Sequence, residues 1–117
     1  MKALVITALS GPDSLKIQDA PEPTLKPGQT LVRVTAGGLN FADLMTAQGG
    51  YPGTPPPPLI AGREFCGIEE ESGRRVMGYA QWGAFAEKAA ADFWSTPARL
   101  RRASIGGSYP TTWNSSG

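Results

Sequence analysis

Residues 37–52 read GGLNFADLMTAQGGYP, a short apolar run that carries an Asn, an Asp and a Tyr between two glycine pairs. Apolar residues recur within it at helical spacing, which predicts about two turns of helix over residues 41–48. Asn40 is a suitable N-cap, Asp43 places a negative charge in the first turn, and Gly49 can end the helix in the left-handed conformation. Because so short a helix is not stable alone, the surrounding chain must hold it in place.

The stretches before this helix predict β-strands. Residues 2–8, KALVITA, are rich in β-branched and apolar side chains. Residues 14–20, SLKIQDA, alternate between apolar and polar, so Leu15 and Ile17 are expected on one half-buried face. Residues 30–38, TLVRVTAGG, carry the strongest strand pattern in the chain. Turn residues such as Pro, Gly and Asp separate these segments.

The stretches after the helix continue the strand pattern. Residues 64–79 predict a hairpin with a two-residue turn at 72–73, which would set the two glutamates before the turn against the two arginines after it. Residues 83–91, GAFAEKAAA, favour a closing strand over a short helix. Many short strands joined by Gly and Pro turns predict a mainly β, antiparallel architecture, either a small barrel or a partly open sandwich.

Two segments lack a regular period. Residues 51–62, YPGTPPPPLIAG, predict a rigid, extended loop, because consecutive prolines favour polyproline II geometry. An open alternative is that this loop is a ligand for a proline-reading domain. Residues 93–117 are rich in small and polar residues and resemble out-of-frame translation, so we expect one domain over 1–92 and an irregular tail over 93–117.

Composition excludes several kinds of chemistry. The 117-residue chain has no histidine and one cysteine, Cys66, so Ser–His and Cys–His nucleophile pairs are absent and the usual zinc sites are nearly excluded. Cys66 is expected to be a small buried hydrophobe. The net charge of +1 gives no general attraction to nucleic acid or membranes. A single thiol fits a reducing compartment, so we expect a cytoplasmic protein.

Four segments resemble the N-terminal, GroES-like domain of the medium-chain dehydrogenase/reductase superfamily. They are MKALVI at the start of the chain, the opening stretch itself, PLIAGREFCGI and RRVMGYAQWGAFAEK. The motif NFADLM followed by Gly-Gly-Tyr-Pro is similar to the zinc-free quinone oxidoreductases (zeta-crystallin-like) and the related synaptic vesicle membrane protein family. The resemblance implies a GroES-like, partly open β-barrel with one or two short helices.

The resemblance also implies site residues. Zinc-containing members place a cysteine before the helix and a His-Glu pair after the loop, where this chain has Asn40 and Arg63-Glu64. In zinc-free members the matching Asn and Tyr face the nicotinamide and the quinone, which implies catalytic roles for Asn40 and Tyr51 and cofactor contacts for Asn40 and Arg63. The amide of Asn40 and the hydroxyl of Tyr51 are hydrogen-bond donors, which suits a reaction that develops negative charge on a quinone oxygen. Asp43 belongs to the same motif, although its place in the helix already explains it.

The other half of the family's site is not found in the sequence. Members bind NADPH with a Rossmann domain whose glycine-rich turn cradles the pyrophosphate, and no Gly-x-Gly-x-x-Gly occurs here. We therefore expect a truncated or frame-shifted member: the substrate-side domain of an NADPH-dependent quinone or enone reductase, inactive alone, without tight cofactor binding and with doubtful oligomerisation. The alternatives are a binding module that uses the Pro-rich loop or a pocket at Tyr51, and a remnant without function.

Overall fold

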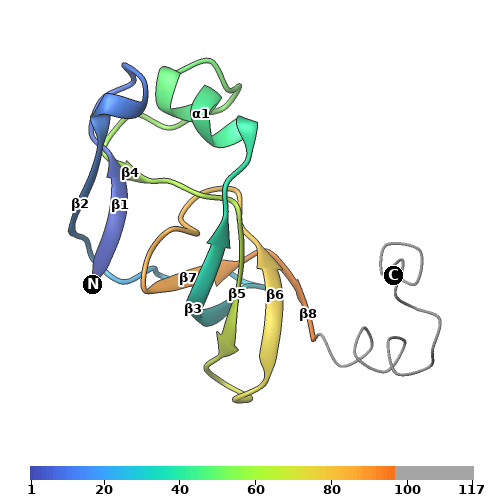
Figure 1. The fold of residues 1–117 in the computed structure, drawn as a ribbon. Helices are drawn as coiled ribbons and strands as arrows, with labels where there is room; N and C mark the ends of the chain where they lie inside the picture. Colours follow the sequence, from blue (N-terminus) through green and yellow to red (C-terminus); the bar gives the residue numbers. More distant parts are fainter. Residues whose placement is uncertain (97–117) are drawn as a thin grey trace.

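Two antiparallel sheets and one α-helix make up the part of the chain that the computed structural model describes, residues 1–96. Most of the expected irregular tail lies outside the described residues (Figure 1). The helices are the 3₁₀ turn η1 (Pro12–Ser14) and α1 (Phe41–Gln48). The strands are β1 (Lys2–Ile6), β2 (Leu15–Asp19), β3 (Thr30–Gly38), β4 (Leu59–Ile60), β5 (Glu64–Glu69), β6 (Arg75–Tyr79), β7 (Lys88–Ala91) and β8 (Phe93–Ser95).

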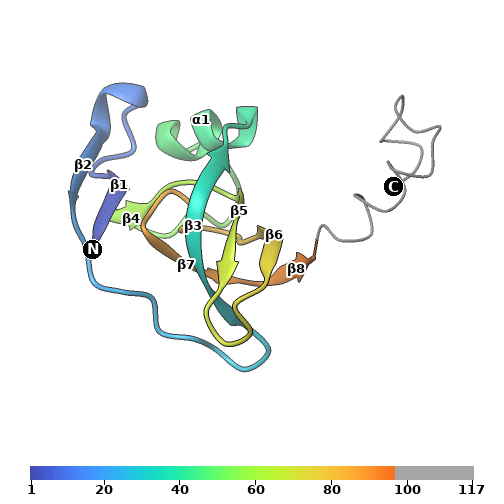
Figure 2. The same ribbon diagram turned by 60° about the horizontal axis from the view of Figure 1, so that its bottom comes forward.

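The larger sheet is curled, and this curl gives the fold its shape (Figure 2). The strand orders are β2-β1-β4 in the small sheet and β7-β3-β5-β6-β8 in the large one. β7 and β8 follow each other in sequence, yet they lie at opposite edges of the large sheet. One residue separates them, Asp92, whose N–H donates to the carbonyl of Tyr79 at 2.8 Å. The predicted mainly β, partly open barrel is confirmed.

Phe85 joins the two sheets. The N–H of Leu4 on β1 donates to the carbonyl of Phe85 at 2.8 Å, and the N–H of Phe85 donates to the carbonyl of Ala61 at 2.9 Å. The Phe85 ring packs against the buried clusters of both sheets. Gly37 and Gly62 leave the space that the ring occupies, because a Cβ on either glycine would overlap it.

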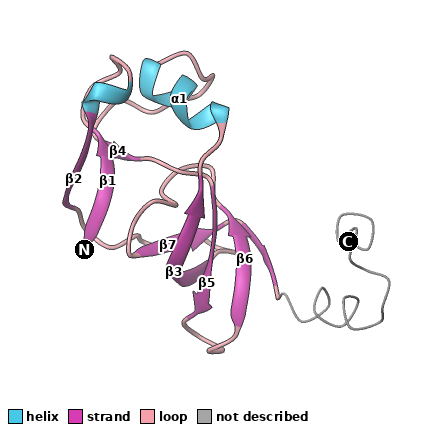
Figure 3. Cartoon of the chain, in the orientation of Figure 1, coloured by secondary structure: helices cyan, strands magenta, loops and turns pink. Residues whose placement is uncertain are grey.

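The helix α1 closes one end of the fold beside η1 (Figure 3). Its predicted ends are confirmed. Asn40 is the N-cap, and its N–H donates to Asp43 Oδ2 at 2.8 Å. Gly49 adopts the left-handed conformation with φ of 82°. The N–H of Gly11, just before η1, donates to the carbonyl of Ala47 at 2.9 Å, which ties the helix to the small sheet.

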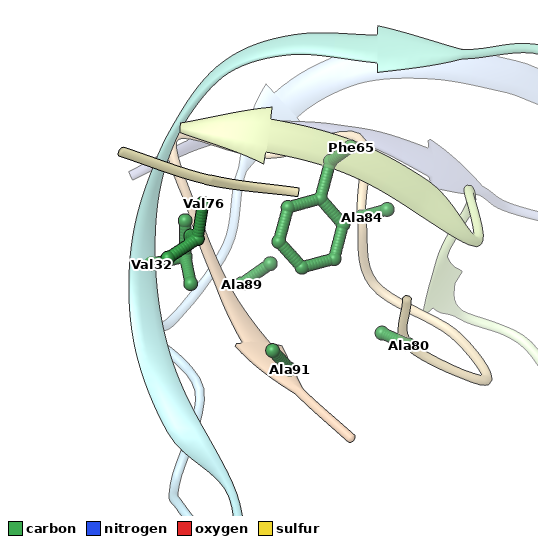
Figure 4. Packing of buried hydrophobic residues seen from close by; sticks show 7 residues of the cluster. All are labelled: Val32, Phe65, Val76, Ala80, Ala84, Ala89 and Ala91. Atoms are coloured by element: carbon green, nitrogen blue, oxygen red, sulfur yellow. The ribbon is translucent and has the colours of Figure 1, made fainter. Parts of the chain in front are cut away.

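The core of the large sheet is small and rich in alanine (Figure 4). Phe65 is its only aromatic member that is buried, and Val32 and Val76 are its largest fully buried side chains. The remaining members are alanines from β7 and from the loop after β6, which let the curled strands approach each other: Ala80, Ala84, Ala89 and Ala91.

The predicted hairpin forms, but the predicted register is wrong. β5 and β6 pair Ile68 with Arg75, so no two-residue turn joins them. Gly73, with φ of +71°, donates its N–H to the carbonyl of Glu69 at 2.8 Å and closes a wider loop. The expected pairs, Glu71 with Arg74 and Glu70 with Arg75, are therefore absent. Arg74 lies opposite Glu69 instead, and Glu70 lies 3.1 Å from Lys88 Nζ.

Three further expectations need correction. Ile17 is 76% exposed, because β2 is the edge strand of the small sheet and only Leu15 of the pair is partly buried. The segment expected to be irregular from residue 93 begins with a strand, since Phe93–Ser95 pair with β6. The closing strand expected over 83–91 is regular only from Lys88 onward.

Glycine at position 67 allows β3 and β5 to pair closely. A Cβ on Gly67 would overlap the backbone carbonyl oxygen of Arg33, which cannot move without breaking the β3–β5 ladder. We expect Gly67→Ala to lower the free energy of unfolding by about 1–3 kcal/mol. Urea denaturation of the full chain measures this. Gly50→Ala is the control: its Cβ would meet nothing closer than 3.9 Å, so an equal loss there would contradict the steric explanation.

Glu69 makes stability depend on pH. Hydrogen bonds from the Ser72 and Thr30 hydroxyls, at 2.6 and 2.8 Å, hold the pKa of Glu69 below its ordinary value of 4.5. Because folding favours the charged carboxylate, its contribution is complete above the unfolded pKa and is lost as pH falls through the folded pKa.

We therefore expect the melting temperature of the wild type to fall more steeply on acidification than that of Glu69→Gln. Melts from about pH 6 to about pH 3 measure the difference. The exposed neighbour Glu71→Gln is the matched control. If the melting temperatures of the wild type and of Glu69→Gln fall equally steeply with pH, these hydrogen bonds do not favour the carboxylate.

Candidate functional site

Asn40 lies at the start of α1 and is partly exposed. Asn40 follows the end of β3 by two residues. The hydrogen bond from the Asn40 N–H to the Asp43 carboxylate holds the backbone at the start of α1. Its two neighbours are among the most exposed apolar residues in the described part of the chain: Leu39 is 71% exposed and Phe41 is 74% exposed. The partly exposed Asn40 is thus flanked in the sequence by two exposed apolar side chains.

Tyr51 lies beyond the other end of α1, in the loop that follows Gly49. One face of its ring covers the guanidinium of Arg63, whose central carbon is 3.9 Å from the ring centre. The rings of Tyr51 and Trp82 form a T-shaped contact, with ring centres 6.1 Å apart and planes at 87°. These contacts come from segments far apart in sequence, so tertiary packing determines the orientation of the Tyr51 ring.

Arg63 is the centre of this cluster and is only 5% exposed. Its Nη1 donates to the carbonyl of Gln81 at 3.0 Å, and its Nη2 donates to Thr46 Oγ1 at 3.1 Å. Trp82 lies with its ring centre 4.6 Å from the guanidinium carbon. Nε of Arg63 is buried and has no hydrogen-bond partner among residues 1–96.

No carboxylate in the described part of the chain forms an ion pair with Arg63. A buried charge without a counter-ion is costly, so other groups must offset the lost hydration. Each aromatic contact contributes about 0.5–2 kcal/mol, and each hydrogen bond from a charged donor about 1.5–3 kcal/mol. Thr46 lies in the last turn of α1, where the helix dipole is negative and the helix itself has no basic residue.

The structure brings Tyr51 and Arg63 together and leaves Asn40 apart from them. Asn40 and Tyr51 flank the two ends of an eight-residue helix, which is about 12 Å long. Sequence reasoning missed Trp82, Thr46 and the carbonyl of Gln81. No local pattern could have found them, because each acquires its role only when separate loops meet around Arg63.

A shallow, mainly apolar hollow of ≈ 450 Å³ lies over β3, β5 and β6. Its lining includes Gly38, two residues before Asn40 in the sequence. None of the three candidate residues lines it. The expectation that Cys66 is a small buried hydrophobe is wrong: the residue is only half-buried, lines this hollow, and its Sγ lies 3.8 Å from Thr35 Oγ1. The hollow is lined by Ala36, Gly37, Gly38, Glu64, Phe65, Cys66, Met77 and Gly78.

Residues 1–96 contain neither a cluster of metal ligands nor a membrane-spanning helix. Over residues 1–96, no group of three or more His, Cys, Asp or Glu side chains is placed to hold a metal ion. In the same part of the chain, no helix is both long enough and apolar enough to cross a membrane.

Comparison with known proteins adds the family. Residues 26–83 match the alcohol dehydrogenase GroES-like domain. A synaptic vesicle membrane protein VAT-1 homolog of Danio rerio is 46% identical over 76 residues, which are 64% of this chain and 16% of that protein. The matched residues therefore span less than a fifth of that relative's length.

Solved structures agree with this match. The quinone oxidoreductase of Thermus thermophilus, described with its NADPH complex, has a TM-score of 0.67 and 40% identity over 79% of this chain and 30% of that chain. The human VAT-1 homolog-like protein has a TM-score of 0.76 and 29% identity over 91% of this chain and 42% of that chain. The curled sheet, the capped helix and these matches agree with the resemblance: the chain belongs to the alcohol dehydrogenase GroES-like family of medium-chain dehydrogenases/reductases.

Proposed function

We propose that residues 1–92 form the substrate side of an NADPH-dependent, zinc-independent quinone reductase. The observation that carries this proposal is the likeness in both sequence and fold to the Thermus thermophilus quinone oxidoreductase, at 40% identity. A quinone or a related enone is the proposed substrate. NADPH, when bound, would supply the hydride.

The surroundings of Asn40 fit a flat ring that carries carbonyl groups. The exposed side chains of Leu39 and Phe41 offer apolar contact, and the amide between them offers a hydrogen-bond donor. Both a nicotinamide and a quinone combine these two features. We assign Asn40 to binding the nicotinamide and to stabilising charge in the reaction, because a fixed donor acts most strongly where negative charge develops.

Tyr51 suits the role of proton donor. A quinone oxygen that receives negative charge during reduction needs a proton, and the phenol hydroxyl can provide it. Arg63 and Trp82 hold the ring, so the hydroxyl is offered from a fixed direction. Since Asn40 and Tyr51 lie at opposite ends of α1, they would contact different parts of the cofactor and substrate pair.

The sequence provides no residues for the adenine nucleotide half of NADPH, because it lacks a glycine-rich phosphate-binding turn. The buried, internally bonded Arg63 is also poorly placed to reach a cofactor phosphate. With no histidine and one cysteine, the donor set does not suit zinc either. A further cofactor-binding domain is therefore needed for turnover.

The first test uses the 117-residue chain alone. We expect no loss of NADPH absorbance above the blank when NADPH and duroquinone are added, because nothing in the sequence binds the adenine nucleotide. Duroquinone is chosen because its ring is fully substituted and does not alkylate Cys66. Sustained oxidation above the blank would show that the chain needs no second domain.

The second test supplies that domain. Residues 1–92 replace the matching segment of the Thermus thermophilus quinone oxidoreductase, and the chimera is assayed with NADPH and duroquinone. We expect activity, with Asn40→Ala lowering kcat by about 10²–10³ and Tyr51→Phe by about 10²–10⁴. Tyr79→Phe, on β6, is the control. A folded chimera whose kcat is equal in all variants would refute the assigned roles.

A further inference from the structure

Arg63 is the one buried cation in the described residues that makes no ion pair, and its contacts join three separate segments. Tyr51 belongs to the loop after α1, Thr46 to the last turn of α1, and Gln81 and Trp82 to the loop after β6. The proposed reaction leaves Arg63 without a direct contact to cofactor or substrate. A charge buried at this junction needs another explanation.

The aromatic rings form a corner around the guanidinium. The guanidinium carbon of Arg63 lies 3.9 Å from the ring centre of Tyr51 and 4.6 Å from that of Trp82, and the two ring centres are 6.1 Å apart. These three distances form a nearly right-angled triangle with its right angle at the guanidinium carbon, so the rings lie on adjacent sides of the guanidinium. Their planes are nearly perpendicular, at 87°. The Tyr51 ring is thus held on one face by Arg63 and by a T-shaped contact with Trp82, and a rotation that tilts the ring would break one contact or the other.

We propose that Arg63 is a positioning residue for Tyr51: its guanidinium fixes the direction in which the phenol hydroxyl points. This inference rests on the proposed function only in taking Tyr51 as the proton donor. Arg63 itself is anchored at both ends. Its carbonyl accepts the N–H of Ala80 at 2.8 Å, and its side chain bonds to Gln81 and Thr46.

Only arginine can make this set of contacts. The guanidinium is planar, so its face stacks on a ring while N–H groups at its edge donate to two acceptors at once. It also keeps its charge throughout the range in which proteins fold. A lysine at position 63 would keep the charge and the aliphatic stem but would lose the flat face and the fork.

The test measures Tyr51 directly in the full 117-residue chain labelled with 3-fluorotyrosine. Fluorine NMR resolves the three tyrosines, and single Tyr→Phe variants assign them. We expect the Tyr51 resonance of the wild type to be displaced from its position in the urea-denatured chain. In Arg63→Lys and in Arg63→Met it should return most of the way, while the Tyr79 resonance, whose ring lies beside Phe93, stays in place.

Two further variants sharpen the result. Arg33→Met removes an exposed arginine from β3 and should leave the Tyr51 resonance unchanged. Trp82→Leu removes the T-shaped contact without altering any charge and should shift Tyr51 alone. If Arg63→Met does not fold, Arg63→Lys and Trp82→Leu decide the matter. An unchanged Tyr51 resonance in folded Arg63→Lys and Trp82→Leu overturns the proposal.

A kinetic measurement separates this inference from the proposed function. In the chimera described above, Arg63→Lys should lower kcat, but it should have no further effect when Tyr51 is already phenylalanine, because residues that act through one group are not additive. If Arg63→Lys lowers kcat by the same factor with tyrosine and with phenylalanine at position 51, Arg63 does not act through Tyr51. An inactive chimera refutes the proposed function alone, since the fluorine resonances are measured without cofactor or substrate.

Discussion

The backbone and ring of Phe85 are the contact through which two small sheets become one domain. Its carbonyl accepts from Leu4 on β1, its N–H donates to Ala61 beside β4, and its ring enters the buried clusters of both sheets. Each sheet by itself buries few large side chains, and the core around Phe65 is mostly alanine. Because neither cluster is large enough to hold a sheet alone, the placement of α1 and of the candidate site depends on this shared contact.

Local rules predicted the parts of the fold that local physics controls. The start of α1 at Asn40 and its end at Gly49 depend on backbone groups within one or two turns, and both expectations were correct. The hairpin register depends on side chains that are distant in sequence. The hydroxyl of Thr30 on β3 donates to the carboxylate of Glu69, and Lys88 on β7 forms an ion pair with Glu70. Exposure of Ile17 follows from its position on an edge strand, which alternation alone does not reveal.

The candidate site divides in the same way. Asn40, Tyr51 and Arg63 are recognisable from a family motif, but the motif does not tell which of them meet. Arg63 contacts Thr46, 17 residues away, and Gln81, 18 residues away, and the aromatic partner Trp82 follows directly after Gln81. The Arg63 charge, for which the resemblance implied a cofactor contact, thus lies inside the protein, against two aromatic rings and the C-terminal end of α1.

The pairing of β1 with residues 85–87 has a consequence for synthesis. The N–H of Lys2 donates to a carboxylate 85 positions later, and Glu87 also accepts from Val34 through its carbonyl. Contacts of such high sequence separation form slowly, because a long loop must close before any bond compensates for the lost entropy. During synthesis, β1 therefore cannot make its contacts with the segment around Phe85 until that segment has left the ribosomal exit tunnel. Until then, the apolar side chains of β1 that this segment covers stay exposed.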